Sequence, residues 1–213
     1  MPIPSFLQPL QNLAPPPLAA PAAALGGAVP ASGSLTGFVV QTQEEAQWCW
    51  AAVSTSVAIF FGSKKWTQCR VASGELDPLN CCGVDRSTGC NIPWYLDTAL
   101  TRVGHFDRID ASSAPFSDVQ TEVNGKRPLG CRIAWAGGSA HFVAIGGWST
   151  AADGTEYVDV YDPYYGFTQK TYGDFVSAYR TTGDTWTHSY FTRATAAALA
   201  GAPAPSANSP KSA

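Results

Sequence analysis

The sequence predicts an α+β fold in which a helical lobe precedes an antiparallel β-sheet lobe. Apolar residues recur at helical spacing in the first half of the chain, whereas short runs rich in β-branched and aromatic residues fill the second half. Because helices and strands are segregated along the chain, we expect separate layers rather than alternating β-α-β units. Hydrophobic residues make up 45% of the 213 residues and charged residues 14%, which is enough apolar material for a core.

Four helices are predicted before the sheet begins. The first, 48–61, carries Ala, Val, Ile and Phe at helical spacing and ends at Gly62, a residue that favours the end of a helix. The third begins after Asn91, has Pro93 in its first turn and stops at Gly104. The second and fourth are short and are expected at 67–74 and 116–123.

Five strands are then predicted, with one short helix between the last two. Runs of β-branched and aromatic residues place the strands at 129–135, 141–148, 157–161, 167–171 and 187–192. The helix is expected at 175–179. Of the tryptophans that flank these elements, Trp48, Trp50 and Trp148 are candidates either for the core or for the wall of a cleft.

The two ends of the chain differ in composition from the middle. Residues 1–34 hold half of the sixteen Pro, many Ala and no charged side chain. We interpret 1–34 as a disordered Pro/Ala-rich leader, with an export signal of a non-Sec type or a propeptide as the functional alternatives. Residues 195–213 are interpreted as a flexible tail. This division leaves 35–194 as one folded domain.

Charge and composition exclude some classes of partner. The net charge is −3 and no long basic run occurs, so neither nucleic acid nor an anionic membrane surface is an expected partner. Pro interrupts the apolar runs of the leader, so no membrane-spanning helix is expected there. The uncharged leader lacks the basic start of a Sec signal, which favours a specialised bacterial export route or processing of a larger precursor. We expect a secreted monomer.

Six cysteines raise the question of metal or disulfides. Four of them crowd between 69 and 90, and adjacent Cys81 and Cys82 do not match the spacing of zinc ligands, so we expect no metal and no cofactor. Disulfides fit an exported protein better. A vicinal bond would be strained, which leaves two pairings open: 69–81 with 82–90, or 69–82 with 81–90. Cys131 is expected to be a buried free thiol.

The first candidate for chemistry is Cys49. It stands at the start of the long predicted helix, where the helix dipole favours a thiolate over a thiol. A thiolate is the form of cysteine that attacks a carbonyl. Taken alone, Cys49 would more often be a core thiol, so the nucleophile hypothesis depends on partners elsewhere in the chain.

His141 and Asp162 are the expected partners. His141 follows a glycine-rich stretch and opens an apolar strand, a position that faces a cleft and holds the ring rigidly. Asp162 ends the next strand, before Pro163, so adjacent antiparallel strands could place it beside His141. Asp159 on the same strand is the alternative. The other two histidines are expected to be solvated in a loop (His105) and structural in a strand (His188).

An oxyanion formed by attack on a carbonyl needs hydrogen-bond donors. The backbone N–H of Cys49 is one, and a side-chain amide is the natural second. Gln43, six residues before Cys49, is the preferred candidate, with Gln41 and Gln47 as alternatives.

Together these motifs resemble those of the papain-like cysteine peptidases. Gln, Cys, His and Asp occur in the order of that family, and the Cys opens a long helix. The resemblance is closest to the bacterial branch typified by the AvrRpt2 effector peptidases, and the C39-type bacteriocin-leader peptidases have a similar order. It covers about 37–170 and rests on Gln47-Trp48-Cys49-Trp50-Ala51-Ala52, Gln68-Cys69, Cys81-Cys82, Cys90-Asn91, Gly137-Gly138-Ser139-Ala140-His141 and Asp162-Pro163.

The resemblance implies a papain-like two-lobed fold and hydrolysis of a protein or peptide substrate through a thioester. It assigns Cys49 as nucleophile, His141 as base and acid, Asp162 as the orienting group and Gln43 as the oxyanion donor. Plant-type papain peptidases have Gly and a small residue before the Cys, and Asn as third member, whereas this chain has Gln47-Trp48 and Asp, as in the bacterial branch.

Other activities use the same constellation. A cell-wall peptidase, a deamidase or an acyltransferase would form the same thioester. A non-catalytic interaction module that kept the fold is an alternative of a different class.

Overall fold

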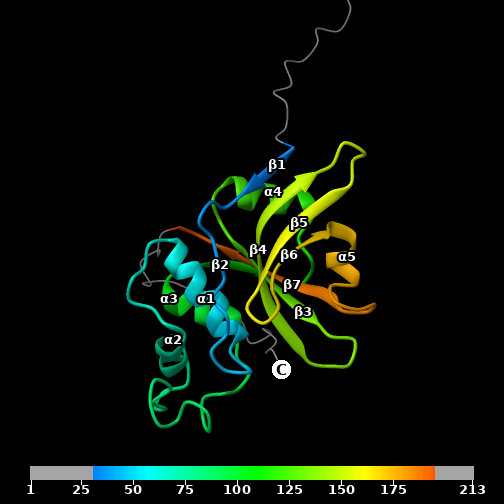
Figure 1. Ribbon diagram of the computed structural model, residues 1–213. Coiled ribbons are helices and arrows are strands. Elements are labelled where there is room, and N and C mark those ends of the chain that lie inside the picture. Colours follow the sequence, from blue (N-terminus) through cyan, green and yellow to red (C-terminus); the bar gives the residue numbers. More distant parts are fainter. Residues whose placement is uncertain (1–30, 195–213) are drawn as a thin grey trace, which may run out of the picture.

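The computed structural model describes residues 31–194 and consists of an antiparallel sheet with three helices gathered at one side and two further helices packed on the strands. Helices α1, α2 and α3 lie together at the left of Figure 1, and most of the sheet lies to their right. This arrangement confirms the predicted α+β class with a helical part and a sheet part. The predicted leader and tail lie almost entirely outside the described residues.

The helical side is formed by three helices that follow one another in the chain. Helix α1 is buried at every position from Cys49 to Ala58, because it packs against α2, α3 and strand β4. Trp48, Trp50 and Trp148 are no more than 1% exposed, so all three belong to the core and none forms a cleft wall. The helices are α1 (Cys49–Phe60), α2 (Gln68–Glu75), α3 (Leu96–Val103), α4 (Phe116–Asn124) and α5 (Tyr172–Ser177).

The sheet has seven strands, and every pairing between neighbours is antiparallel. Its order is β2-β7-β3-β4-β5-β6, and β1 pairs with the C-terminal part of β4. The strands are β1 (Ser32–Ser34), β2 (Phe106–Asp110), β3 (Leu129–Ala134), β4 (Ala140–Thr150), β5 (Glu156–Asp162), β6 (Gly166–Thr171) and β7 (Thr185–Thr192). The five strands predicted from the sequence are present within two residues of their expected bounds.

Two strands were not predicted. Strand β1 lies inside the segment assigned to the leader, because Ser32–Ser34 pair with Gly147–Ser149 of β4. Three such small residues carry no β signal, and only the partner strand makes them a strand. Strand β2 contains Asp107, Arg108 and Asp110, and such a charged segment is tolerated because β2 is at the edge of the sheet.

Two helices, α3 and α5, differ from their predicted bounds by more than one residue. Helix α3 begins at Leu96 rather than just after Asn91, because the chain before it is held extended: the indole of Trp50 donates to the carbonyl of Ile92 at 3.1 Å. Helix α5 begins at Tyr172 rather than Phe175, because Thr171 caps it by accepting a hydrogen bond from the Asp174 N–H. Tyr179 therefore lies beyond the helix.

The prediction for His105 was wrong. Its side chain is only 7% exposed, and its Nδ1 lies 2.9 Å from the carbonyl of Arg193 while its ring packs against Phe61. Burial lowers the pKa of His105, so the ring is neutral at pH 7. His188 lies half-buried in β7, with Nδ1 3.0 Å from the hydroxyl of Thr187.

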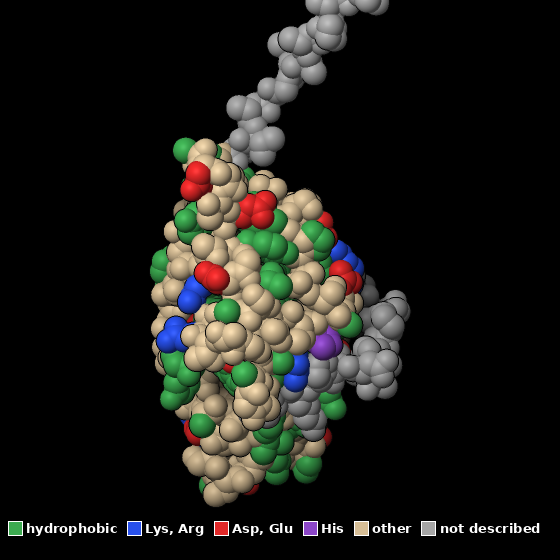
Figure 2. Space-filling model, turned by 90° about the vertical axis from the view of Figure 1, so that its right-hand side faces the viewer, with side chains coloured by type: hydrophobic (Ala, Val, Ile, Leu, Met, Phe, Trp, Pro, Cys, Tyr) green, Lys and Arg blue, Asp and Glu red, His purple; other side chains and the backbone are tan. Residues whose placement is uncertain are grey.

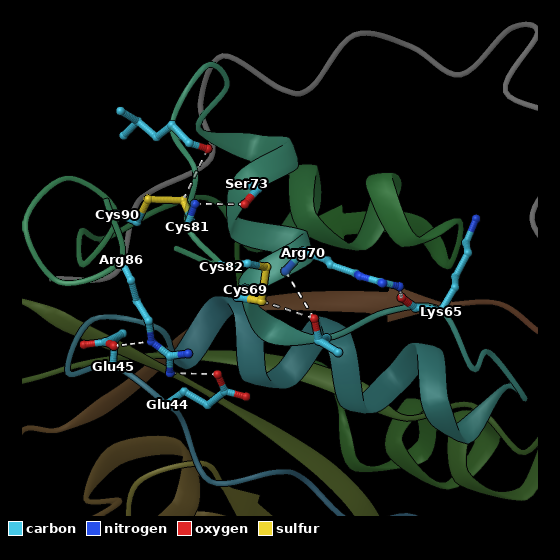
Figure 3. Close-up of a disulfide and its surroundings, with 12 residues drawn as sticks. Glu44, Glu45, Lys65, Cys69, Arg70, Ser73, Cys81, Cys82, Arg86 and Cys90 are labelled. Atoms are coloured by element: carbon cyan, nitrogen blue, oxygen red, sulfur yellow. Dashed lines mark hydrogen bonds and ion pairs between the residues drawn. A yellow bond between two sulfur atoms is a disulfide. The ribbon is translucent and has the colours of Figure 1, made fainter. Parts of the chain in front are cut away.

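The cysteines form the second of the two pairings left open by the sequence. Disulfides join Cys69 to Cys82 and Cys81 to Cys90, and Cys131 is a buried free thiol as expected. Burial raises the pKa of the Cys131 thiol well above its ordinary value, which keeps it protonated. The Cys69–Cys82 disulfide ties helix α2 to the loop after it, and the Cys81–Cys90 disulfide closes that loop on itself (Figure 3).

Two general features of the described residues bear on partners. No helix among them combines the length and the apolar character needed to cross a bilayer. On the face shown in Figure 2, acidic and basic side chains are scattered among hydrophobic and neutral surface.

Candidate active site

Cys49 is the first residue of α1, as the sequence predicted, and the loop that precedes α3 fixes its position. Asn91 Oδ1 accepts the Gln47 N–H at 2.9 Å, and the Cys90 carbonyl accepts the indole N–H of Trp48 at 2.7 Å. The Ile92 carbonyl also accepts the indole N–H of Trp50. Three hydrogen bonds from residues next to Cys49 therefore end on three consecutive residues, 90–92. The thiol is 4% exposed, which restricts access to its sulfur from the bulk solvent.

The same loop is also joined to the segment before Cys49 by ion pairs. Arg86 donates to Glu45 at 2.6 Å and to Glu44 at 2.8 Å (Figure 3). Its guanidinium also lies over the ring of Trp48. Because the Arg86 and Glu44 side chains are more than a third exposed, these pairs contribute little stability on their own. Their role is to link residues 44–48 to the disulfide-bonded loop.

His141 is the second residue of β4 and lies on the opposite wall of the site. Its side chain is 7% exposed, and its ring stacks on that of Trp135, with centroids 5.6 Å apart. Tyr165 meets the ring edge to face at 6.4 Å. The histidine is hydrogen-bonded to Cys49 as well as to Asp162. Since Nε2 is engaged by Asp162, Nδ1 is the nitrogen that remains for the thiol.

Asp162 ends β5 and contacts His141 directly. Its Oδ1 lies 2.8 Å from His141 Nε2 and also accepts the backbone N–H groups of Tyr164 and Tyr165, at 2.7 and 2.9 Å. Asp159, the alternative, lies three positions earlier and accepts instead from Gln169 at 2.9 Å. Positions three apart point to opposite faces of a strand, so only one of the two aspartates can reach the histidine.

The electrostatics of the pair favour charges on both partners. Burial works to lower the pKa of His141, but the hydrogen bonds to Asp162 and Cys49 outweigh it and raise this pKa to about 9. Burial likewise opposes ionisation of Asp162, yet its hydrogen bonds from His141, Tyr165 and Tyr164 leave its pKa below the ordinary value. At neutral pH the site therefore contains an imidazolium and a carboxylate.

Gln43 reaches the site but its amide is turned inward. A cavity of about 150 Å³ is lined by Cys49, His141 and Gln43, together with Ala46, Gln47, Trp135, Ala140, Tyr164 and Tyr165. The Nε2 of Gln43 donates to the carbonyls of Glu45 at 3.0 Å and Ala46 at 2.7 Å, and its Oε1 is buried without a partner. Gln47 also lines this cavity, whereas Gln41 does not.

Three features of the site have no signal in the sequence. Tyr179 donates from its hydroxyl to Asp162 Oδ2 at 2.8 Å, Trp135 stacks on His141, and the backbone after Pro163 binds Asp162. Tyr179 lies seventeen residues from its partner, and Trp135 lies in a turn between β3 and β4. For the third feature, the Asp162-Pro163 motif at the end of a strand is the one local sign, because Asp at such a position often accepts backbone N–H groups of the turn that follows.

A family model of the papain-like cysteine protease AvrRpt2 matches residues 35–180 of the chain. The chain belongs to this family. The match covers Gln43, Cys49, His141 and Asp162, and it confirms the expectation of a cysteine peptidase at the level of the family. No curated protein matches the sequence.

Among solved structures, the protein is similar to the Amb a 11 cysteine protease of ragweed pollen in its proform and to the bromelain protease of Ananas comosus in complex with the E64 inhibitor. Amb a 11 matches with 13% identity and a TM-score of 0.48 over 79% of this chain and 66% of that one. Bromelain matches with 13% identity and a TM-score of 0.43 over 77% of this chain and 99% of that one. The chain thus spans just under two thirds of the ragweed proform.

Within residues 31–194, no group of three His, Cys, Asp or Glu side chains is arranged to hold a metal ion.

Proposed function

We propose that this chain is a cysteine endopeptidase in which Cys49 attacks the peptide carbonyl of a protein or peptide substrate. The observation that carries the proposal is the convergence of Cys49, His141 and Asp162 from three different elements into one hydrogen-bonded series. Membership of the family supports the same reaction class.

The proton transfers follow from the charges. With a pKa of about 9, His141 is protonated at pH 7, so it can stabilise a Cys49 thiolate and then donate its proton to the leaving amine. The neutral ring next takes a proton from water, which attacks the thioester and releases the carboxylic acid product. Asp162 holds the ring through Nε2 and stabilises its charge throughout.

The oxyanion in this proposal is bound at the start of α1. The N–H of Cys49 belongs to the first turn of the helix, whose N–H groups have no acceptor within the helix. Gln43 supplies the second donor if its amide turns from the Glu45 and Ala46 carbonyls towards the cavity when substrate binds. This rotation breaks no hydrogen bond of the amide oxygen, because Oε1 of Gln43 is buried without a partner.

Setting and partners are proposals of the same kind. We place the enzyme outside the cytoplasm of the bacterium that makes it, as a secreted effector, because two disulfides fit an oxidising compartment. It needs no metal and no second protein for the steps above, and we expect it to act as a monomer.

The test is digestion of a proteome-derived peptide library by the wild-type protein and by Cys49→Ala, with the products identified by mass spectrometry. Cleavage should fall at least about 10⁴-fold in the variant, because the thiolate has no substitute. Cys131→Ala is the matched control, since it removes the other free thiol and leaves the site intact. Equal cleavage by Cys49→Ala would contradict the proposal.

A further inference from the structure

The least expected part of the site is the way in which Asp162 is bound. Oδ1 of Asp162 contacts His141 Nε2 and also accepts the N–H groups of Tyr164 and Tyr165. These two backbone donors lie in the turn that follows β5 and are ordinary for an Asp at the end of a strand. The other oxygen, Oδ2, accepts only the Tyr179 hydroxyl among the described residues. Asp162 is 3% exposed, so water does not replace a missing donor easily.

Tyr179 is held in place by contacts that have no other evident purpose. It is fully buried and lies past the end of α5, where its N–H donates to the Asp184 carbonyl at 3.1 Å. The carboxylate of Asp184 in turn accepts from the N–H and the hydroxyl of Thr181 and from the Ala136 N–H. The loop 178–184 is thereby fixed to the residue that follows Trp135.

Trp135 is a second link between Tyr179 and the His141 ring, in addition to the hydrogen bonds through Asp162. Its ring is nearly parallel to His141, at 17° and 5.6 Å, and nearly parallel to Tyr179, at 21° and 6.3 Å. Phe175 closes the tyrosine ring from another side, edge to face at 5.4 Å. The phenol therefore cannot turn away from Asp162 without disturbing this aromatic packing.

We infer that Tyr179 is a positioning residue of the catalytic site, which holds the Asp162 carboxylate ionised and correctly oriented towards His141. Tyr179 is buried behind Asp162 and does not line the cavity, so it does not touch substrate. This inference deepens the proposed function, on which it rests, because it matters for turnover only if the triad is catalytic.

The direction of the effect follows from the chemistry of the acceptor. A phenol donates to a carboxylate more strongly than to a carboxylic acid, so loss of the hydroxyl raises the pKa of Asp162. The other titratable or charged groups around Tyr179 and Asp162 are the same in every protein that the test compares: His141, Cys49, Tyr165, Arg180 and Asp184 are kept, and Cys131 is replaced by Ala throughout. The acid limb of any reaction that needs the Asp162 charge should therefore move to higher pH in Tyr179→Phe.

The experiment measures the rate at which iodoacetamide alkylates Cys49 across pH 3 to 10, in a Cys131→Ala background so that only one thiol reacts. Tyr179→Phe should shift the acid limb upward by about one pH unit, the effect of one hydrogen bond to a charged group. Peptidase kinetics on the same variants should show about a tenfold lower kcat with an unchanged KM. Tyr172→Phe is the matched control, because it removes a hydroxyl that donates to the Ala114 carbonyl at 2.9 Å, outside the cavity lining.

An acid limb of Tyr179→Phe that coincides with that of Tyr172→Phe would overturn the inference. Should Tyr179→Phe not fold, 3-fluorotyrosine at position 179 replaces it: its more acidic hydroxyl should shift the acid limb to lower pH, and an unchanged limb overturns the inference equally. Alkylation needs no peptide substrate. An upward shift without any peptide cleavage would thus keep the role of Tyr179 while rejecting the proposed peptidase activity.

Discussion

The two walls of the site are stabilised by different means. The wall that carries Cys49 is the start of a helix, and it is bound to a loop that two disulfides close. The wall that carries His141 and Asp162 consists of two adjacent strands. It is held by the hydrogen bond from Tyr179 in the loop after α5 and by the stacking of Trp135, in the β3–β4 turn, on His141. Loss of a disulfide should therefore disturb the first wall, whereas changes of charge or pH should disturb the second.

Apart from removal of the nucleophile itself, the largest effect is expected on the sheet wall, at Asp162. Asp162→Asn keeps an oxygen for His141 and for the two backbone N–H groups but removes the charge, so kcat/KM should fall about 100-fold, the lower end of what a positioned acid–base group contributes. Asp162→Ala also removes the acceptor and should lose about tenfold more. Peptide cleavage by purified variants measures both.

The same variant tests the charge of His141. In the wild type, activity should fall as pH rises through about 9, where His141 loses its proton. Since this pKa lies above the ordinary 6.5, the ion pair stabilises the fold fully below pH 6.5, and that contribution is lost as pH rises through about 9. Asp162→Asn should move the alkaline limb to lower pH, and an unmoved limb would contradict this account.

An intermediate effect is expected from the disulfides of the helix wall. The paired variants Cys81→Ala/Cys90→Ala and Cys69→Ala/Cys82→Ala should each lose about 2–3 kcal/mol of unfolding free energy in urea melts. Only the first pair should also lose about tenfold in kcat/KM, because the Cys90 carbonyl binds the Trp48 indole. Equal losses of activity in both would show that the loop acts through stability alone.

The smallest effect is expected at Asn91. Asn91→Ala removes the acceptor of the Gln47 N–H and should lower kcat/KM about fivefold, the value of one neutral hydrogen bond. Asn91→Asp keeps an acceptor at the same place and serves as the control, with activity close to wild type. The alkaline limb should be unchanged in both, since neither touches His141; a shifted limb would mean that the two walls are not independent.

The predictability of the two walls also differs. Cys49 opens a helix whose spacing and Gly62 stop are local features, and the strands that carry His141 and Asp162 were predicted within two residues of their bounds. Residues 92–95, the end of the loop before α3, were assigned to the helix instead, because their non-helical form depends on the Trp50 indole, which lies 42 residues from Ile92 in sequence. The role of this loop in fixing Cys49 was accordingly missed.

The amino-acid sequence by itself predicted the order of the five helices and of strands β3 to β7, the candidate triad residues and the two possible disulfide pairings, since these predictions depend on local periodicity, spacing and strain. Only the tertiary structure showed that Asp162 rather than Asp159 contacts His141, and which of the two disulfide pairings forms. It alone showed that Tyr179 contacts Asp162 and that Trp135 stacks on His141. Each of these depends on which side chains meet across strands and loops. Such meetings are fixed by the sheet register and by packing, and neither is written in any single segment.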